Sequence, residues 1–148
     1  MGAECQGGQC ELSVGSKMIY RFFWLQNEDA DHVFAAATSV AGFELEGESF
    51  SLFVGPGPGL IPLYQSYCAS CTDHFQTVND GEGAPTFGQQ EVLGYCAKTP
   101  IPEASTALFR LHSDGYSNHF VTKSAGEAQA AVTELGYVIE SEGICYVP

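Results

Sequence analysis

The sequence has 148 residues, of which 45% are apolar and 12% aromatic, with 17 glycines and 7 prolines. This composition is typical of a turn-rich globular protein and excludes a disordered chain. The formal net charge of −13 makes nucleic acid and anionic membranes poor partners. No apolar run reaches the roughly 20 residues that a membrane-spanning helix needs, so we expect no membrane insertion. We expect a single domain over residues 1–148.

The N-terminal segment, residues 1–16, carries two of the six cysteines and lacks the basic start and apolar stretch of a secretory signal. Six cysteines in so short a chain are nevertheless typical of an oxidising compartment, and we expect an extracellular or secreted protein. The full pairing does not follow from the sequence. We expect local bridges between Cys5 and Cys10 and between Cys68 and Cys71, because the "CASC" segment lacks the second pair of ligands that zinc requires.

Alternating apolar runs follow at residues 17–24, 60–68 and 105–113. Period-two patterning with many aromatic residues predicts a β-strand in each. Polar turns come next, and then three similar phrases, "ADHVF", "TDHFQ" and "SNHFV", which contain His32, His74 and His119. We expect each phrase to form a second strand. With Phe75 and Phe120 in the core, the histidines would face outward or into a groove.

The segments 42–54, 86–97 and 136–147 each predict two short strands around a turn rich in glutamate and glycine. Before the last of these, Ser124 and Glu127 form a capping-box pattern. Apolar residues continue from there at helical spacing, and Gly136 provides a stop. The sequence therefore predicts one short helix, in the third unit.

These patterns recur every 42 to 45 residues and predict three repeats of about 43 residues, at 17–57, 60–102 and 105–148. One such unit cannot cover its own apolar face, whereas three arranged around an axis can. We expect an all-β fold, mainly β with a short helix, around a pseudo-threefold axis. A three-bladed, propeller-like arrangement is favoured, and a β-trefoil is the alternative.

Each copy contains, in order, variants of Leu-Tyr-x-x-Tyr, Asp-His-Phe, Gly-Tyr and Glu-Gly-Ile, most clearly within residues 107–147. This order resembles an uncharacterised tandem-repeat domain family of fungi and bacteria, often appended to secreted hydrolases. The resemblance covers nearly the whole chain from about residue 17 and is loosest in the first copy. It implies a binding accessory to hydrolases and hence carbohydrate recognition, as in a small fungal lectin.

Aligned polar residues in the three copies are the candidate ligand-binding set. Planar donors and acceptors beside aromatic rings suit the hydroxyls and the apolar face of a sugar. The sequence thus predicts a lectin with up to three equivalent weak sites that gain avidity on glycans or glycoproteins. The candidate residues are Arg21, Asp31, His32, Glu48, Gln65, Asp73, His74, Glu91, Arg110, Asn118, His119 and Glu142.

Other interpretations of these residues stay open. The repeated Asp and His can hold the turn between the first two strands, or the three histidines can converge on one metal ion. A protein-binding module, an inhibitor of secreted enzymes and a structural accessory domain are the alternative functions. We predict no metal site, no cofactor and no enzyme, because a motif repeated three times suits binding, and the Gly-x-Ser-x-Gly elbow is missing. The sequence leaves the oligomeric state open.

Overall fold

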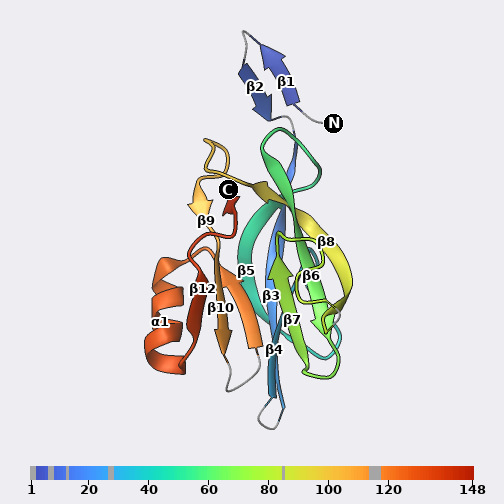
Figure 1. Ribbon diagram of the computed structural model, residues 1–148, viewed down its shortest axis with the longest axis vertical. Coiled ribbons are helices and arrows are strands. Elements are labelled where there is room, and N and C mark those ends of the chain that lie inside the picture. The colour runs from blue at the N-terminus through green and yellow to red at the C-terminus, as the bar shows by residue number, and fades with distance from the viewer. Residues whose placement is uncertain (1–2, 7–8, 13, 27–28, 85, 114–117) are drawn as a thin grey trace.

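The protein is mainly β, as its alternating apolar runs predict. We describe a computed structural model that defines residues 3–6, 9–12, 14–26, 29–84, 86–113 and 118–148. These residues form thirteen strands and one helix (Figure 1). The strands are β1 (Ala3–Gln6), β2 (Gln9–Leu12), β3 (Ser16–Gln26), β4 (Asp29–Ala35), β5 (Glu44–Phe53), β6 (Leu60–Cys68), β7 (Asp73–Thr77), β8 (Gly88–Ala97), β9 (Thr106–Ala107), β10 (Phe109–Ser113), β11 (Asn118–Thr122), β12 (Val138–Ser141) and β13 (Tyr146–Val147), and the helix is α1 (Ala125–Leu135).

Three groups of antiparallel strands have the same internal order. In each group the first strand in the sequence lies in the middle and pairs with the next two, giving β4-β3-β5, β7-β6-β8 and β11-β10-β12. The first two groups join through β5 and β8 into one larger sheet, to which β13 and β9 add. The third group is a separate three-stranded sheet. The described strands do not close into a barrel.

The alternating runs place the core residues as expected. Ile19, Leu63 and Leu108 are each fully buried, and they belong to one continuous apolar cluster. Phe75 and Phe120 are also buried, as the histidine phrases predict. At roughly 25 cal/mol for each Å² of apolar surface removed from water, such side chains supply the main driving force for this fold.

The expected hairpins within 42–54 and 86–97 are wrong. Each segment forms one long strand, β5 or β8, instead of two short ones. In β5 the expected turn is an irregularity in the pairing with β3, where Gly47 adopts a φ of 126° that suits glycine. The chain therefore bends without reversing, and the first two units have three strands each. The third segment does contain two strands, β12 and β13, but they pair with different partners.

Helix α1 begins and ends where its sequence predicts. The Ser124 hydroxyl accepts a hydrogen bond from the backbone N–H of Glu127 at 3.0 Å, which caps the first turn. Gly136 follows the last turn in the left-handed conformation and donates to the carbonyl of Ala131. Ala128 and Ala131 are buried, so the helix covers the third sheet with its small-residue face. In Figure 1 it lies alongside β12 at the outer edge of that sheet.

The described residues contain two disulfides, one within a turn and one between distant segments. One is the expected bridge between Cys68 and Cys71, and the other joins Cys96 of β8 to Cys145 near the C-terminus. The expected pairing of Cys5 with Cys10 concerns side chains outside the described set, although the two residues are opposite each other in the β1–β2 hairpin. The two observed bridges are compatible with an extracellular protein.

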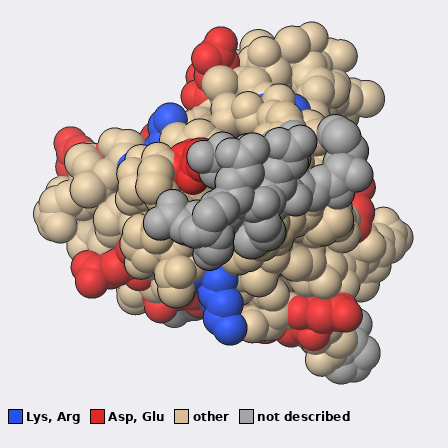
Figure 2. Space-filling view, turned by 90° about the horizontal axis from the view of Figure 1, so that it is seen from above, with Lys and Arg blue, Asp and Glu red and all other residues tan. Residues whose placement is uncertain are grey.

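The described surface is acidic, and its helix is too short to span a membrane. Figure 2 shows acidic side chains scattered around one face, with lysine and arginine in only a few places. No helix among the described residues is long and apolar enough to cross a membrane.

Candidate ligand-binding site

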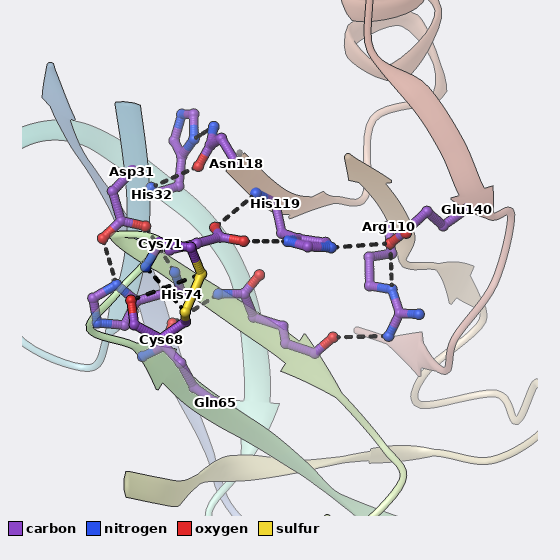
Figure 3. Close-up of polar contacts among 12 residues, drawn as sticks. Asp31, His32, Gln65, Cys68, Cys71, His74, Arg110, Asn118, His119 and Glu140 are labelled. Carbon is purple, nitrogen blue, oxygen red and sulfur yellow. Dashed lines mark hydrogen bonds and ion pairs between the residues drawn. A yellow bond between two sulfur atoms is a disulfide. The ribbon is translucent and has the colours of Figure 1, made fainter. Parts of the chain in front are cut away.

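The three histidine strands, β4, β7 and β11, lie against one another at the centre of the molecule. An Asp or Asn at the start of each motif reaches the histidine of the next strand, and these contacts form a closed ring (Figure 3). The six residues, which we call the polar ring, are Asp31, His32, Asp73, His74, Asn118 and His119.

Two links of the polar ring are aspartate–histidine pairs. Asp31 accepts hydrogen bonds from the backbone N–H of His74 at 2.8 Å and from its ring Nδ1 at 2.6 Å. Asp73 accepts the same two bonds from His119, at 3.0 and 2.5 Å. Both carboxylates are almost fully buried. A carboxylate can only accept, so each histidine carries a proton on Nδ1, and Nε2 is directed away from the ring.

The third link uses an amide and therefore fixes the opposite tautomer. The side-chain Oδ1 of Asn118 accepts from the backbone N–H of His32 at 3.2 Å, so its amide nitrogen must face the imidazole. That nitrogen donates to Nδ1 of His32 at 2.8 Å and lies 2.7 Å from the hydroxyl of Tyr137. A neutral His32 then carries its proton on Nε2, which lies 3.2 Å from Glu46.

Each ring histidine stacks on its neighbour across the first two strands of its group. Phe23 is paired with His32, and their ring centroids are 4.9 Å apart. Tyr67 stacks on His74 at 4.6 Å. In the third group the neighbour of His119 is His112, at 4.2 Å. The stacking partner is therefore aromatic in every group, but only the third group places two imidazoles together.

Outside the polar ring, Arg21 of β3 binds carboxylates from distant segments. Its guanidinium makes two hydrogen bonds to Glu127 of α1, at 2.8 and 2.6 Å, and one to Glu46 at 2.9 Å. It also lies 5.4 Å from the ring centroid of Phe120. Strand β3 is thereby attached to helix α1 and to β11 of the third group.

Arg110 of β10 makes a similar set of contacts with the second group. It binds Glu82 and the backbone carbonyl of Gln76, and its Nε donates to Glu140 at 3.1 Å. The guanidinium carbon is 4.6 Å from the ring centroid of Phe75. Each arginine of the aligned pair thus contacts the segment that follows the histidine of the preceding group.

Gln65 occupies the aligned position in the second group. Like the two arginines, its side chain contacts the segment that follows the histidine of the preceding group. It donates to the carbonyl of Phe34 and accepts from its N–H, both at 3.0 Å. Its Nε2 also lies 3.4 Å from Glu91. Because this amide saturates a buried backbone, the substitution keeps the contact between groups while removing the charge.

Burial and ion pairing shift the pKa values of several of these groups. Burial favours a lower pKa for His119, but hydrogen bonds to Asp73 and Glu140 outweigh it and raise the pKa to about 8. The hydrogen bond from His119 lowers the pKa of Glu140 despite partial burial. The pKa of Glu127 is lowered by its hydrogen bonds from Arg21. His119 is therefore mostly protonated at neutral pH beside the carboxylate of Glu140.

A hollow of about 290 Å³ opens beside His74. Three aromatic residues line it, Trp24, Phe43 and Tyr67, together with Asp31, His74 and Thr72 and the small residues Ala41 and Gly42. We call it the aromatic hollow. Nε2 of His74 has no hydrogen-bond partner in the part of the chain that the structure describes. The imidazole of His74 thus lies among aromatic side chains.

The β6–β7 turn forms one edge of the aromatic hollow. The Cys68–Cys71 bridge closes this turn, and Thr72 follows it with a φ of 51°. A β-branched residue rarely adopts this left-handed conformation, which costs of the order of 1–3 kcal/mol. The strained residue thus directly follows the disulfide-closed turn at the edge of the hollow.

A second hollow, of about 310 Å³, lies beside His32. Its surface includes Arg21, Glu46 and Glu127, which are paired with one another, and the apolar side chains of α1. Arg21 already forms ion pairs with both glutamates, so this hollow offers a ligand fewer polar groups without a partner than the aromatic hollow does. The surroundings of the ring histidines therefore differ from one group to the next.

The structure brings most of the predicted site residues together but leaves two outside. Ten of the twelve lie in the polar ring or in the contacts of Arg21, Gln65 and Arg110 around it. His32 and His119 are only 8% exposed, so they do not face outward. Glu48 and Glu142 are exposed, and neither side chain has a hydrogen-bond partner among the described residues. The three histidines bind separate partners, which does not match convergence on one metal ion.

Sequence reasoning missed four carboxylates and three aromatic residues. Glu46 and Glu140 each contact a ring histidine and an arginine. The alignment of the three copies predicts Glu48 and Glu142 instead, two places later in the sequence. The "EGE" and "ESE" segments contain both candidates, and strand alternation alone cannot select between them. The other residues missed as site members are Glu82, Glu127, Phe43, Trp24 and Tyr67.

Strand order, polar ring and aromatic hollow define a mainly β domain with a buried polar centre and one aromatic recess at its surface. Residues 18–147 match a family described as Domain of unknown function (DUF5648). The chain therefore belongs to this family, whose match spans all three strand groups. No curated protein and no solved structure matches the chain.

Proposed function

We propose that this protein is a carbohydrate-binding protein, a lectin, and that its principal site is the aromatic hollow. The observation that carries the proposal is the presence of Trp24, Phe43 and Tyr67 around the imidazole of His74, whose Nε2 has no hydrogen-bond partner among the described residues. Aromatic faces bind the apolar face of a sugar ring, and polar groups beside them select its hydroxyls. Asp31 fixes the imidazole through Nδ1, so a neutral His74 presents a lone pair to a hydroxyl donor.

The size of the hollow suits a small ligand. Its volume of about 290 Å³ lies at the lower end of the roughly 300–1,000 Å³ typical of small-molecule sites. A single sugar ring with part of its neighbour fits this range better than a long oligosaccharide does. The open surface around it also suits the weak, readily reversible binding on which multivalent lectins depend.

A threefold internal repeat is part of the same proposal. The support is the common strand order of three groups and the closed ring of contacts from each Asp or Asn to the next histidine. The side chains at the three aligned positions each contact the preceding group around the ring, and these residues are Arg21, Gln65 and Arg110. In this scheme the ring holds the three units together, and residues around it have diverged. Of the three expected sites, we therefore propose one aromatic site instead of three equivalent ones.

We also propose that the protein acts outside the cell on glycans or glycoproteins. Disulfides at Cys68–Cys71 and Cys96–Cys145 support an oxidising compartment. An acidic surface supports binding to neutral or basic glycans more than to sulfated ones, because like charges repel. We propose binding without catalysis.

Glycan-array binding of the wild-type protein tests this function. We expect binding to a restricted set of glycans, reduced at least tenfold in Trp24→Ala and Tyr67→Ala because each removes an aromatic face. Val138→Ala is the matched control, since it deletes an exposed apolar side chain of β12 far from the hollow in sequence. Far-ultraviolet circular dichroism checks that each variant is folded.

A blank array at high protein concentration would overturn the proposal. So would full glycan binding by a folded Trp24→Ala variant, because the hollow would then not be the site. Capture of a secreted enzyme that free sugars do not disturb would favour the alternative, a protein-binding module or inhibitor. The array is run in the presence of a chelator, so that the result does not depend on any metal ion.

A further inference from the structure

Two histidines and a glutamate meet at the end of the third sheet. His112 of β10, His119 of β11 and Glu140 of β12 each offer one ligand atom, and these atoms all lie within 4.8 Å of one another. The three residues come from three paired strands, and His112 is directly opposite His119. The cluster is therefore held by a sheet and not by a mobile loop.

One pair of ligand atoms is spaced as in a coordination shell, and all three atoms lie within 4.8 Å of one another. Ligands at about 2.0–2.1 Å from a tetrahedral zinc ion are roughly 3.3–3.4 Å apart. Nε2 of His119 is 3.5 Å from Oε1 of Glu140, and the two imidazole centroids are 4.2 Å apart. Rotation of the two imidazoles, which are tilted by 30° to each other, would bring all three ligand atoms to one ion.

The surroundings of His119 resemble the second layer of a metal site. Asp73 accepts the Nδ1 proton of His119, which aims Nε2 toward Glu140 (Figure 3). Metal-binding histidines usually donate their other ring nitrogen to a carboxylate in this way, which fixes the tautomer and raises the basicity of the ligand. Arg110 holds Glu140 from the other side at 3.1 Å, and its charge is expected to weaken cation binding without preventing it.

The corresponding positions of the other two groups lack the second imidazole. Phe23 stacks on His32 and Tyr67 stacks on His74 where His112 stacks on His119. A second imidazole at this position is therefore particular to the third group, where it adds a nitrogen ligand beside His119 and Glu140.

We propose that His112, His119 and Glu140 bind a divalent transition-metal cation such as zinc. Two imidazoles and one carboxylate are a common ligand set for zinc, and three protein ligands leave a fourth position for water or for a ligand group. This site lies on the third sheet and is separate from the aromatic hollow, so it neither requires nor excludes the proposed sugar binding.

Titration of the metal-free protein with Zn²⁺ by calorimetry, and with Co²⁺ by visible absorption, tests this site. We use mildly alkaline buffer, in which His119 gives up its proton more readily. We expect one ion per chain, d–d absorption bands of a nitrogen- and oxygen-ligated Co²⁺, and a higher melting temperature with Zn²⁺. His112→Phe copies the pairing of Phe23 with His32, and we expect it to remain folded and to lose at least tenfold in affinity.

Two further variants make the result decisive. Glu140→Gln keeps a hydrogen-bond acceptor but removes the charged ligand, so it should also bind at least tenfold more weakly. Glu103→Gln removes one exposed acidic group elsewhere and should bind as the wild type does, which controls for attraction to the acidic surface. The proposal is overturned if the wild type binds no ion, or if His112→Phe, or Glu140→Gln where His112→Phe does not fold, binds as tightly as the wild type.

Discussion

At the scale of single residues, the choice between Asp and Asn decides what each ring histidine presents to its surroundings. Asn118 donates to Nδ1 of His32 and leaves the proton on Nε2, where Glu46 accepts it. Asp31 accepts the Nδ1 proton of His74, and this imidazole lines the aromatic hollow with Nε2 unprotonated when the ring is neutral. One oxygen-for-nitrogen exchange thus separates a closed internal contact from a group that a ligand can reach.

This exchange gives a test of the polar ring within the chain itself. We expect Asp73→Ala to lower the free energy of unfolding by about 3–5 kcal/mol, because it leaves the buried His119 without its partner. Asp73→Asn should cost less than half as much, since Asn118 already makes this contact with His32 and the tautomer of His119 can change. Urea unfolding followed by circular dichroism measures both. Equal losses in the two variants would contradict the role given to the ring.

At the scale of elements, sequence patterns located the first two strands of each group and the helix, but they predicted hairpins where β5 and β8 are single strands. The runs around Ile19, Leu63 and Leu108 have simple period-two patterning, and the capping box at Ser124 is a local signal. The pairing of β5 with β3 shifts twice, around Tyr20 and Arg21, and no alternation in the sequence reports such a shift. An alignment of the copies therefore does not show which glutamate of β5 contacts Arg21 and His32.

The close approach of β8 to β5 depends on Gly94. A Cβ atom at Gly94 would lie 2.7 Å from Cβ of Leu52 and 3.1 Å from the carbonyl oxygen of Phe53. We expect Gly94→Ala to lower the free energy of unfolding by about 1–3 kcal/mol, because the two strands must move apart. Gly88→Ala in the same strand meets nothing within 4 Å and should change the stability little. Thermal unfolding of both variants checks this, and an equal effect would show that the close approach is unimportant.

At the scale of the whole molecule, the arrangement of the three groups could be predicted only in outline. The interval between the histidines predicts three similar units, a repeat that stays a proposal, and the structure contains three strand groups of the same order. The partner of each ring residue, however, lies 43 to 86 positions away in the sequence. Contacts over such separations depend on how the groups meet in space, and local patterns carry no information about it. The aromatic hollow escaped prediction for the same reason, since Trp24, Phe43 and Tyr67 come from different segments.

The first and last groups are attached by the pair between Arg21 and Glu127, which are 106 positions apart. The hydrogen bonds from Arg21 lower the pKa of Glu127 below its ordinary value of 4.5 in the folded protein. A carboxyl group whose pKa falls on folding stabilises the native state above its unfolded value, and this contribution is lost as the pH drops through the folded value. Wild type should therefore exceed Glu127→Gln in stability at neutral pH.

The expected difference is about 1 kcal/mol or less, because the Glu127 side chain is 39% exposed and solvent screens the pair. Melting temperatures measured from neutral pH down to pH 3 should show the two proteins converging below about pH 4. Glu134→Gln, on the exposed surface of the same helix, is the control and should track the wild type more closely throughout. A gap between wild type and Glu127→Gln that persists unchanged at pH 3 would mean that the carboxylate charge does not attach α1 to β3.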